Sequence, residues 1–396
     1  MAVDKVVEIP VSLEVPIGPQ HPALHEPVML KVYAEGEEVV KVEVNTGYNH
    51  RGVEKLTEKN SFYRNIFIVS RVCGICNIVH SDVYVRAVEQ VMNIEPPRRA
   101  KYLRVLAMEL ERIHSHMIIN AIMAEVLGYD TLFMYIMRDR EKVMKAKEIL
   151  TGNRVLGDYL MVGGVRRDLS EVDRERIKDV LVKLEPEVRK YVRVFEEDET
   201  IGKRLRGVGV VKPRDVTLHG LVGPTARGSG INIDARREGY DAYNEVPFNI
   251  IVRGDMDSWS RMMVRWHETI ESINMCKYVL ENLPSDGPAV PDETKLSRKF
   301  PVGEAFARVE APRGELTYYV MSDGRQNPFR VKIRTPSFNN IINSGFSYIG
   351  YTIADVPVIL TSYDPCISCM ERAIVTDLRR GERKYIRFKD LSMGLK

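Results

Sequence analysis

Four of the five cysteines occur in two CxxC pairs, one near each end of the chain. The first pair, Cys73 and Cys76, lies in the segment RVCGICNIVH, residues 71–80. The second pair, Cys366 and Cys369, lies in DPCISCMER, residues 364–372. Thiolates are soft donors, which suit zinc, iron or nickel better than magnesium or calcium. The residue types therefore indicate a metal site made of four thiolates.

The spacing of the two pairs excludes a local zinc knuckle. Between Cys76 and Cys366 lie 289 residues, whereas structural zinc ribbons bring two CxxC pairs within roughly 15–20 residues. The tertiary fold must therefore bring the two ends together. Two independent redox or structural pairs, or thiols that bind nothing, are the alternatives. The fifth cysteine, Cys276, is expected to be a small buried apolar residue in a helix.

Both segments resemble the metal-binding motifs of the large subunit of NiFe hydrogenases. They look like those of the membrane-bound, energy-converting group, which is related to the 49-kDa subunit of respiratory complex I. The resemblance extends from residue 16 to residue 373. It implies a NiFe centre in which all four cysteines bind nickel, while Cys76 and Cys369 also bridge to iron. The remaining iron ligands in that family are diatomic and do not come from the protein.

A proline-rich loop, GPQHPALHEP at residues 18–27, resembles the loop that faces the active site in this superfamily. The resemblance implies that Glu26 transfers protons, which a carboxylate can do within hydrogen-bond reach of a thiolate. His25 matches a histidine that faces the quinone in complex I. A solvated turn is the alternative for this loop.

Two more candidate residues follow from the resemblance. The segment EAPRGE, residues 310–315, is shared with the superfamily and implies that Arg313 overhangs the metal centre. A guanidinium there can hold diatomic ligands by hydrogen bonds; a surface turn is the alternative. His80 would hydrogen-bond a cysteine sulfur and tune its basicity. In GYNHRGVEKL, residues 47–56, Arg51 and Glu54 are as compatible with a local salt bridge as with catalysis.

The sequence departs from the hydrogenase pattern at Arg372, where most hydrogenases carry histidine, although the membrane-bound group tolerates the change. Complex I subunits have lost both CxxC pairs, so their presence here disfavours quinone reduction. Three functions remain open. The first is proton reduction to hydrogen at a NiFe site. The second is reduction of polysulfide or elemental sulfur, as in sulfur-respiring archaea, without a functional NiFe centre. The third is a non-catalytic scaffold or quinone-module subunit.

The expected partners follow from the same reasoning. Because four cysteines cannot serve both a NiFe site and a cluster, electrons must come from 4Fe-4S clusters in a separate iron–sulfur small subunit. The resemblance implies ferredoxin as the electron donor to the complex and membrane-embedded ion-pumping subunits as further partners. The N-terminus lacks a signal-peptide core and no apolar run approaches 18 residues, so we expect a peripheral subunit on the cytoplasmic face of the membrane.

Composition adds weaker constraints. The net charge is only +3, with no long cluster of lysine and arginine, which argues against nucleic-acid binding. The 29% of charged residues is compatible with a thermophilic source.

The elements that must position these residues can be predicted from periodicity. Alternating apolar and charged residues predict strands at 6–16 and an antiparallel hairpin at 28–46. Residues 306–319 predict a strand, a turn and a second strand. His114 and His116 are expected to be hydrogen-bonded residues of a bundle rather than ligands. Helical spacing predicts long helices at 77–94, 98–127, 131–150, 170–196 and 255–283.

The expected fold class is α+β: a central long-helix bundle, an N-terminal antiparallel β hairpin region and a C-terminal mixed α/β segment, as in NiFe-hydrogenase large subunits. Residues 1–60 would carry the active-site loop, 61–285 the bundle and 286–396 the second CxxC, and we expect the three regions to form one compact body. The glycine-rich segment GPTARGSG, residues 223–230, lacks the Lys-Ser/Thr of a P-loop. It predicts tight packing near the site or against a partner subunit.

Overall fold

The computed structural model describes residues 13–22, 24–285, 287–291 and 299–370. It also describes the backbone of two short strands, β9 (Val375–Asp377) and β10 (Glu382–Lys384). The expectations for residues 6–12 and for Arg372 lie outside the described residues.

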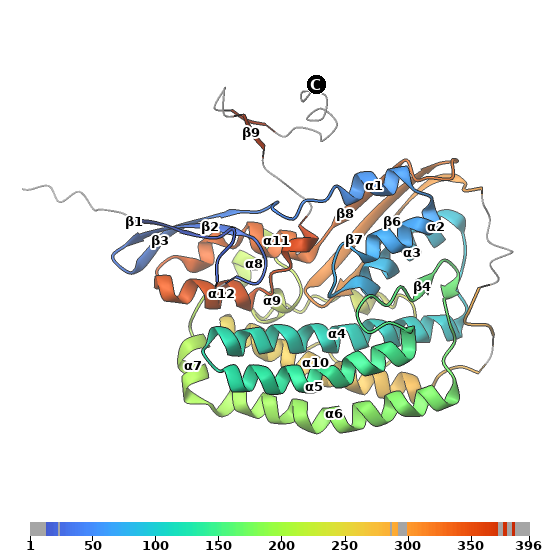
Figure 1. Ribbon diagram of the computed structural model, residues 1–396, viewed down its shortest axis with the longest axis horizontal. Coiled ribbons are helices and arrows are strands. Elements are labelled where there is room, and N and C mark those ends of the chain that lie inside the picture. The colour runs from blue at the N-terminus through green and yellow to red at the C-terminus, as the bar shows by residue number, and fades with distance from the viewer. Residues whose placement is uncertain are drawn as a thin grey trace, which may run out of the picture.

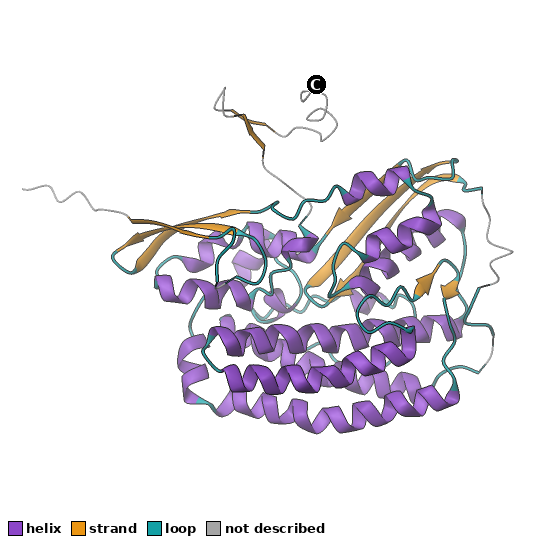
Figure 2. Ribbon diagram, viewed as in Figure 1, coloured by secondary structure: helices purple, strands orange, loops and turns teal. Residues whose placement is uncertain are grey.

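Four long helices form one layer of the molecule (Figures 1 and 2). They are α4 (Arg98–Val126), α5 (Asp130–Thr151), α6 (Glu171–Glu197) and α10 (Ser258–Glu281). Each follows its predicted range to within a few residues, because apolar side chains recur at helical spacing along it. Helix α6 begins where Ser170 Oγ accepts a hydrogen bond from the backbone N–H of Asp173 at 3.1 Å.

A second layer packs on this bundle and contains an antiparallel sheet in the order β6-β7-β8. The predicted strand–turn–strand is confirmed as β6 (Val302–Ala311) and β7 (Gly314–Asp323). The third strand, β8 (Arg330–Arg334), was not predicted. Three helices lie with this sheet (Figure 1): α1 (Val53–Lys59), α2 (Phe62–Ser70) and α3 (Asn77–Met92).

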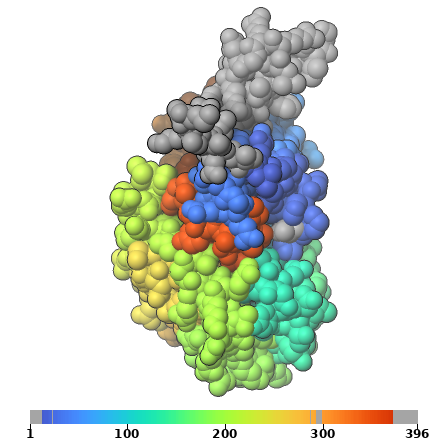
Figure 3. Space-filling view, turned by 90° about the vertical axis from the view of Figure 1, so that its left-hand side faces the viewer, coloured from blue at the N-terminus to red at the C-terminus, as the bar shows by residue number. Residues whose placement is uncertain are grey.

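The N-terminal sheet is antiparallel, in the order β1-β2-β3. Its strands are β1 (Leu13–Ile17), β2 (Met29–Glu35) and β3 (Glu38–Asn45), and β2 with β3 confirms the predicted hairpin. Glu38 pairs across with Thr352, far along the chain. Figure 3 shows the blue N-terminal residues beside the red C-terminal ones. The helices near this sheet are α8 (Pro213–His219), α11 (Pro336–Ile342) and α12 (Val356–Ser362).

The remaining elements are short. They are β4 (Leu160–Met161), β5 (Gly164–Val165), α7 (Glu199–Leu205), α9 (Pro224–Arg227) and the 3-10 turns η1 (Ala235–Glu238), η3 (Ser344–Tyr348), η4 (Ile353–Asp355) and η5 (Ile367–Cys369). Within the described residues, no helix is long and apolar enough to cross a membrane.

Two hydrophobic cores hold the molecule together. The larger joins the long helices to α3 and to the sheet β6-β7-β8. The smaller joins the N-terminal sheet to α8, α11 and α12. Val72 and Ile78, which flank the first CxxC pair, belong to the larger core, whereas Ile367 and Met370 beside the second pair belong to the smaller. The two cysteine pairs therefore meet where the two cores meet.

Candidate metal centre

The four CxxC cysteines come together into one buried cluster. Cys73 and Cys76 lie in the loop from α2 to α3, and Cys366 and Cys369 follow α12. The Sγ atoms of Cys73 and Cys366 are 3.3 Å apart, and those of Cys366 and Cys369 are 3.0 Å apart. All four are free thiols. Their convergence from opposite ends of the chain is what the spacing required. Cys276 lies apart from them, buried in α10 as expected.

The four thiols differ in acidity. Hydrogen bonds from the neighbouring thiols, chiefly Cys366, hold the pKa of Cys73 well below its usual value. A hydrogen bond from Cys369 likewise lowers the pKa of Cys366. The pKa values of Cys76 and Cys369 are raised, first by their hydrogen bonds to Cys366 and then by those to Cys73 and by burial. The first cysteine of each pair thus favours the thiolate. A cation among these sulfurs would release the remaining protons.

His80 lies against the cluster. Its Nε2 is 3.7 Å from the Cys369 sulfur, and its Nδ1 is 2.8 Å from the hydroxyl of Tyr318 on β7. Burial lowers the pKa of His80 to about 4, so the imidazole is neutral at neutral pH. Tyr318 fixes the ring orientation, as an outer-shell partner does for a residue beside a metal site. Sequence reasoning missed Tyr318, whose position in β7 gives no signal beyond strand alternation.

Glu26 contacts the second cysteine pair through the backbone. Its Oε2 accepts hydrogen bonds from the N–H groups of Ile367 and Ser368, the latter at 3.0 Å. Burial, reinforced by the Cys366 thiolate, raises the pKa of Glu26 to about 7. A cavity of about 40 Å³ beside it is also lined by His25. His25 Nε2 lies 3.4 Å from Glu125 on α4. The predicted loop therefore does face the cysteines.

Arg313 is buried in the turn between β6 and β7. Its Nη2 forms an ion pair of 2.7 Å with Asp364, its Nε donates to the Asp364 carbonyl at 3.1 Å, and its Nη1 donates to Ser115 Oγ at 3.0 Å. Burial alone would lower the pKa of Arg313, but Asp364 and the Cys366 thiolate raise it well above its usual value. Arg313 is thus a permanent cation near the thiolates, held in place by Asp364 and Ser115.

The glycine-rich segment 223–230 packs against this turn. A Cβ on Gly223 would lie 2.4 Å from the Arg313 carbonyl oxygen and 2.4 Å from Gly314 Cα. Gly223 also has a φ of 68° and a ψ of −146°, which side chains rarely allow. The prediction of tight packing near the site is therefore met by a direct backbone contact to Arg313.

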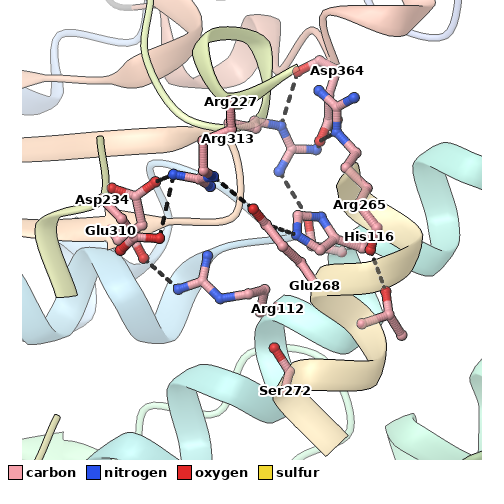
Figure 4. Close-up of polar contacts among 12 residues, drawn as sticks. Arg112, His116, Arg227, Asp234, Arg265, Glu268, Ser272, Glu310, Arg313 and Asp364 are labelled. Carbon is pink, nitrogen blue, oxygen red and sulfur yellow. Dashed lines mark hydrogen bonds and ion pairs between the residues drawn. The ribbon is translucent and has the colours of Figure 1, made fainter. Parts of the chain in front are cut away.

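Near Arg313 and Asp364 lies a buried set of ion pairs, here called the charge network (Figure 4). Arg227 lies at its centre: its Nε pairs with Glu268 at 2.7 Å and its Nη1 with Glu310 at 2.6 Å. Arg265 on α10 lies 3.7 Å from Asp364, the ion-pair partner of Arg313. The members of the network are Glu109, Arg112, His116, Arg227, Asp234, Arg236, Glu268 and Glu310.

The carboxylates of the charge network do not all titrate alike. Burial alone would raise the pKa of Glu109, yet Arg112 and Arg236 bring it down to about 2. Burial, and then repulsion from Asp234, raise the pKa of Glu310 to about 7. His116 Nε2 lies 2.9 Å from Glu268, which agrees with the expected bundle role. His114 likewise accepts from Arg140 Nε at 2.9 Å.

Comparisons with known proteins agree with this fold and site. Residues 51–120 match the family described as nickel-dependent hydrogenase. Residues 127–299 and 292–372 match the respiratory-chain NADH dehydrogenase 49 Kd subunit. The chain therefore belongs to the family of large subunits that complex I and the membrane-bound, hydrogenase-related complexes share, which confirms the resemblance and the expected fold class.

Three proteins similar to this chain illustrate the family. The carbon monoxide-induced hydrogenase of Rhodospirillum rubrum is 40% identical over 360 residues, which cover 90% of this chain and 99% of the relative. The membrane-bound hydrogenase subunit alpha of Pyrococcus furiosus is 37% identical over 392 residues, covering 96% and 91%. A chain in the structure of the membrane-bound sulfane sulfur reductase, an archaeal respiratory membrane complex, is 34% identical with a TM-score of 0.86, covering 91% of this chain and 98% of that one.

Proposed function

We propose that this chain is the catalytic large subunit of a membrane-bound complex that reduces protons to hydrogen at a NiFe centre. One observation carries the proposal: four buried free thiols meet at one point, with two sulfur–sulfur distances of 3.0 and 3.3 Å. Thiols buried together, with lowered pKa values at Cys73 and Cys366, are a poor arrangement for a core. They are a good one for a soft metal.

The residues present fit such a centre. Cys73, Cys76, Cys366 and Cys369 would hold the metals, and two relatives, at 40% and 37% identity, are named as hydrogenases. When bound, the centre supplies the two-electron chemistry that joins two protons and two electrons into hydrogen. Side chains of this chain would transfer protons to and from the thiolates and would set the electrostatic potential around them.

Glu26 would accept and release these protons at neutral pH. Its carboxylate is held beside the second cysteine pair, and the cavity next to it has room for about one water molecule. That cavity leads to His25, which pairs with Glu125 where both side chains reach solvent. We propose this as the proton route, with Arg313 shaping the field at the thiolates and His80 tuning the Cys369 sulfur.

We further propose that electrons reach the thiolate site from 4Fe-4S clusters in an iron–sulfur small subunit, with ferredoxin as the donor to the complex. Membrane-embedded ion-pumping subunits would complete the assembly, with this chain as a peripheral subunit on the cytoplasmic face. The support comes from two relatives that are named as parts of membrane-bound complexes, the membrane-bound hydrogenase subunit alpha and the chain of the membrane-bound sulfane sulfur reductase.

Metal analysis of the natively purified complex tests the proposal, together with infrared spectra searched for CO and CN stretches on iron. About one nickel per chain with those bands, and hydrogen evolution from reduced ferredoxin, is the expected result. Iron without nickel and without diatomic bands would overturn the NiFe centre.

A second candidate is reduction of polysulfide or elemental sulfur on the same scaffold. The observation that favours it is the TM-score of 0.86 to the sulfane sulfur reductase chain. In this case two electrons and two protons would cleave a sulfur–sulfur bond and release hydrogen sulfide. Assays of one preparation with protons and with polysulfide, following hydrogen and hydrogen sulfide, distinguish the two functions.

A further inference from the structure

Arg51 lies in the loop between β3 and α1, and its guanidinium reaches both cysteine segments. It donates to the backbone carbonyls of Arg71 and Val72, each at 2.8 Å, and to the carbonyl of Ser368 at 2.7 Å. Val72 immediately precedes Cys73, and Ser368 lies between Cys366 and Cys369. One side chain therefore joins two segments that are almost 300 positions apart in the sequence.

The hydrogen bonds from Arg51 go to backbone carbonyls that lie outside α-helices and strands. Helix α2 ends at Ser70, so the carbonyls that follow it have no partner within the helix. Ser368 is held on two sides: its N–H donates to Glu26 at 3.0 Å and its carbonyl accepts from Arg51. Only a planar guanidinium presents several N–H donors in a fixed fork, which a lysine ammonium cannot reproduce.

The two segments are otherwise anchored in different cores. Val72 packs in the larger core and Ile367 in the smaller, so a small shift between the cores would change the sulfur–sulfur distances across the site. We infer that Arg51 is a positioning residue that sets the separation of the two CxxC segments and thereby the geometry of the thiolate site. The inference rests on the proposed metal site, although Arg51 itself is not a ligand.

Cobalt titration of the anaerobic, metal-free full-length chain tests this inference. Cobalt bound by thiolates gives sulfur-to-metal absorption, which reports both affinity and the number of sulfurs bound. Arg51→Gln should weaken cobalt binding about 10- to 100-fold, as loss of an outer-shell partner does, and should reduce the absorption per cobalt. Arg51→Lys should restore part of the affinity, which guards against misfolding of the first variant.

Arg330→Gln is the matched control. Arg330 on β8 pairs at 2.9 Å with Glu58 of α1, the helix that follows the loop of Arg51. The side-chain contacts of Arg330 are thus to α1 rather than to the cysteine segments. This variant should bind cobalt as the wild type does. Wild-type affinity and absorption in Arg51→Gln would overturn the inference.

A metal-independent measurement separates this inference from the proposed function. Diamide oxidation of the metal-free chain, followed by peptide mapping, compares disulfides between the segments with those within each CxxC pair. In the wild type the Cys73–Cys366 bridge, between sulfurs 3.3 Å apart, should form in competition with the Cys366–Cys369 bridge, between sulfurs 3.0 Å apart. Arg51→Gln should lower the share of the bridge between segments and raise that of the pairs within each segment. That shift in a chain that binds no cobalt would support Arg51 while contradicting the metal site. An unchanged product ratio would overturn the role of Arg51.

Discussion

The thiol cluster and the charge network are both fully buried, yet they solve the problem of burying polar groups differently. In the charge network, each arginine has a buried carboxylate partner: Arg227 pairs with Glu268 and Glu310, Arg236 with Asp234, and Arg112 with Glu109. In the cluster, the Cys366 sulfur hydrogen-bonds to the sulfurs of Cys73 and Cys369, and the other partners of these sulfurs are neutral groups. In the charge network, positive and negative side chains neutralise one another without a ligand. The thiol cluster concentrates negative charge that a cation would balance, and this difference marks the functional site.

The largest expected effect separates metal binding from folding. Cys366→Ser should abolish metal occupancy and hydrogen evolution, because a hydroxyl is a poor replacement for a nickel thiolate. The free energy of unfolding of the metal-free chain should change by only about 1 kcal/mol. Metal analysis and urea unfolding check the two parts. Cys276→Ser, in the buried thiol of α10, should keep the metal; full nickel occupancy in Cys366→Ser would contradict the comparison.

The charge network should show the opposite response. Arg227→Ala removes the partner of Glu268 and Glu310 and leaves buried carboxylates uncompensated, which should cost about 3–5 kcal/mol of unfolding free energy. Urea unfolding of the metal-free chain measures this loss. Arg98→Ala, which breaks the exposed pair with Glu245, should cost far less unfolding free energy, because water screens that pair. Equal losses of unfolding free energy in the two variants would contradict a larger contribution of the buried network than of an exposed ion pair.

Sequence reasoning found the two regions unequally, for a physical reason. The cysteines could be assigned because CxxC is rare and its chemistry is local to the residue type. The long helices could be assigned because burial imposes a periodicity of 3.6 residues. Arg227 and Glu310 look like ordinary surface charges in the sequence, because charged residues are mostly exposed and no periodicity identifies their partners. Strand β8 was missed because five residues give too short a pattern.

Acid should weaken the charge network in a defined pH range. Glu109 has a folded pKa of about 2, below its ordinary value of 4.5, so its ionised form stabilises the fold above pH 4.5. That contribution is lost progressively as the pH falls from 4.5 toward 2. Urea unfolding of the metal-free chain across this range measures the loss. Glu109→Gln should be less stable at neutral pH and should show a shallower acid decline; an identical decline would remove Glu109 from the explanation.

The last expected effect lies where the two regions adjoin, at Gly223. Gly223→Ala combines a strained backbone, about 1–3 kcal/mol, with a Cβ that would meet the Arg313 carbonyl at 2.4 Å. Gly230→Ala is the matched control in the same segment, because its φ is also positive, at 83°, while nothing lies within 4 Å of an added Cβ. Both variants should lose stability from backbone strain, measured by urea unfolding. Only Gly223→Ala should also lower hydrogen evolution, because the added Cβ would displace the β6–β7 turn, and this turn holds Arg313 near the thiolates. If the two variants lose activity equally, the contact between Gly223 and Arg313 does not link the network to the metal centre, and the two regions work independently.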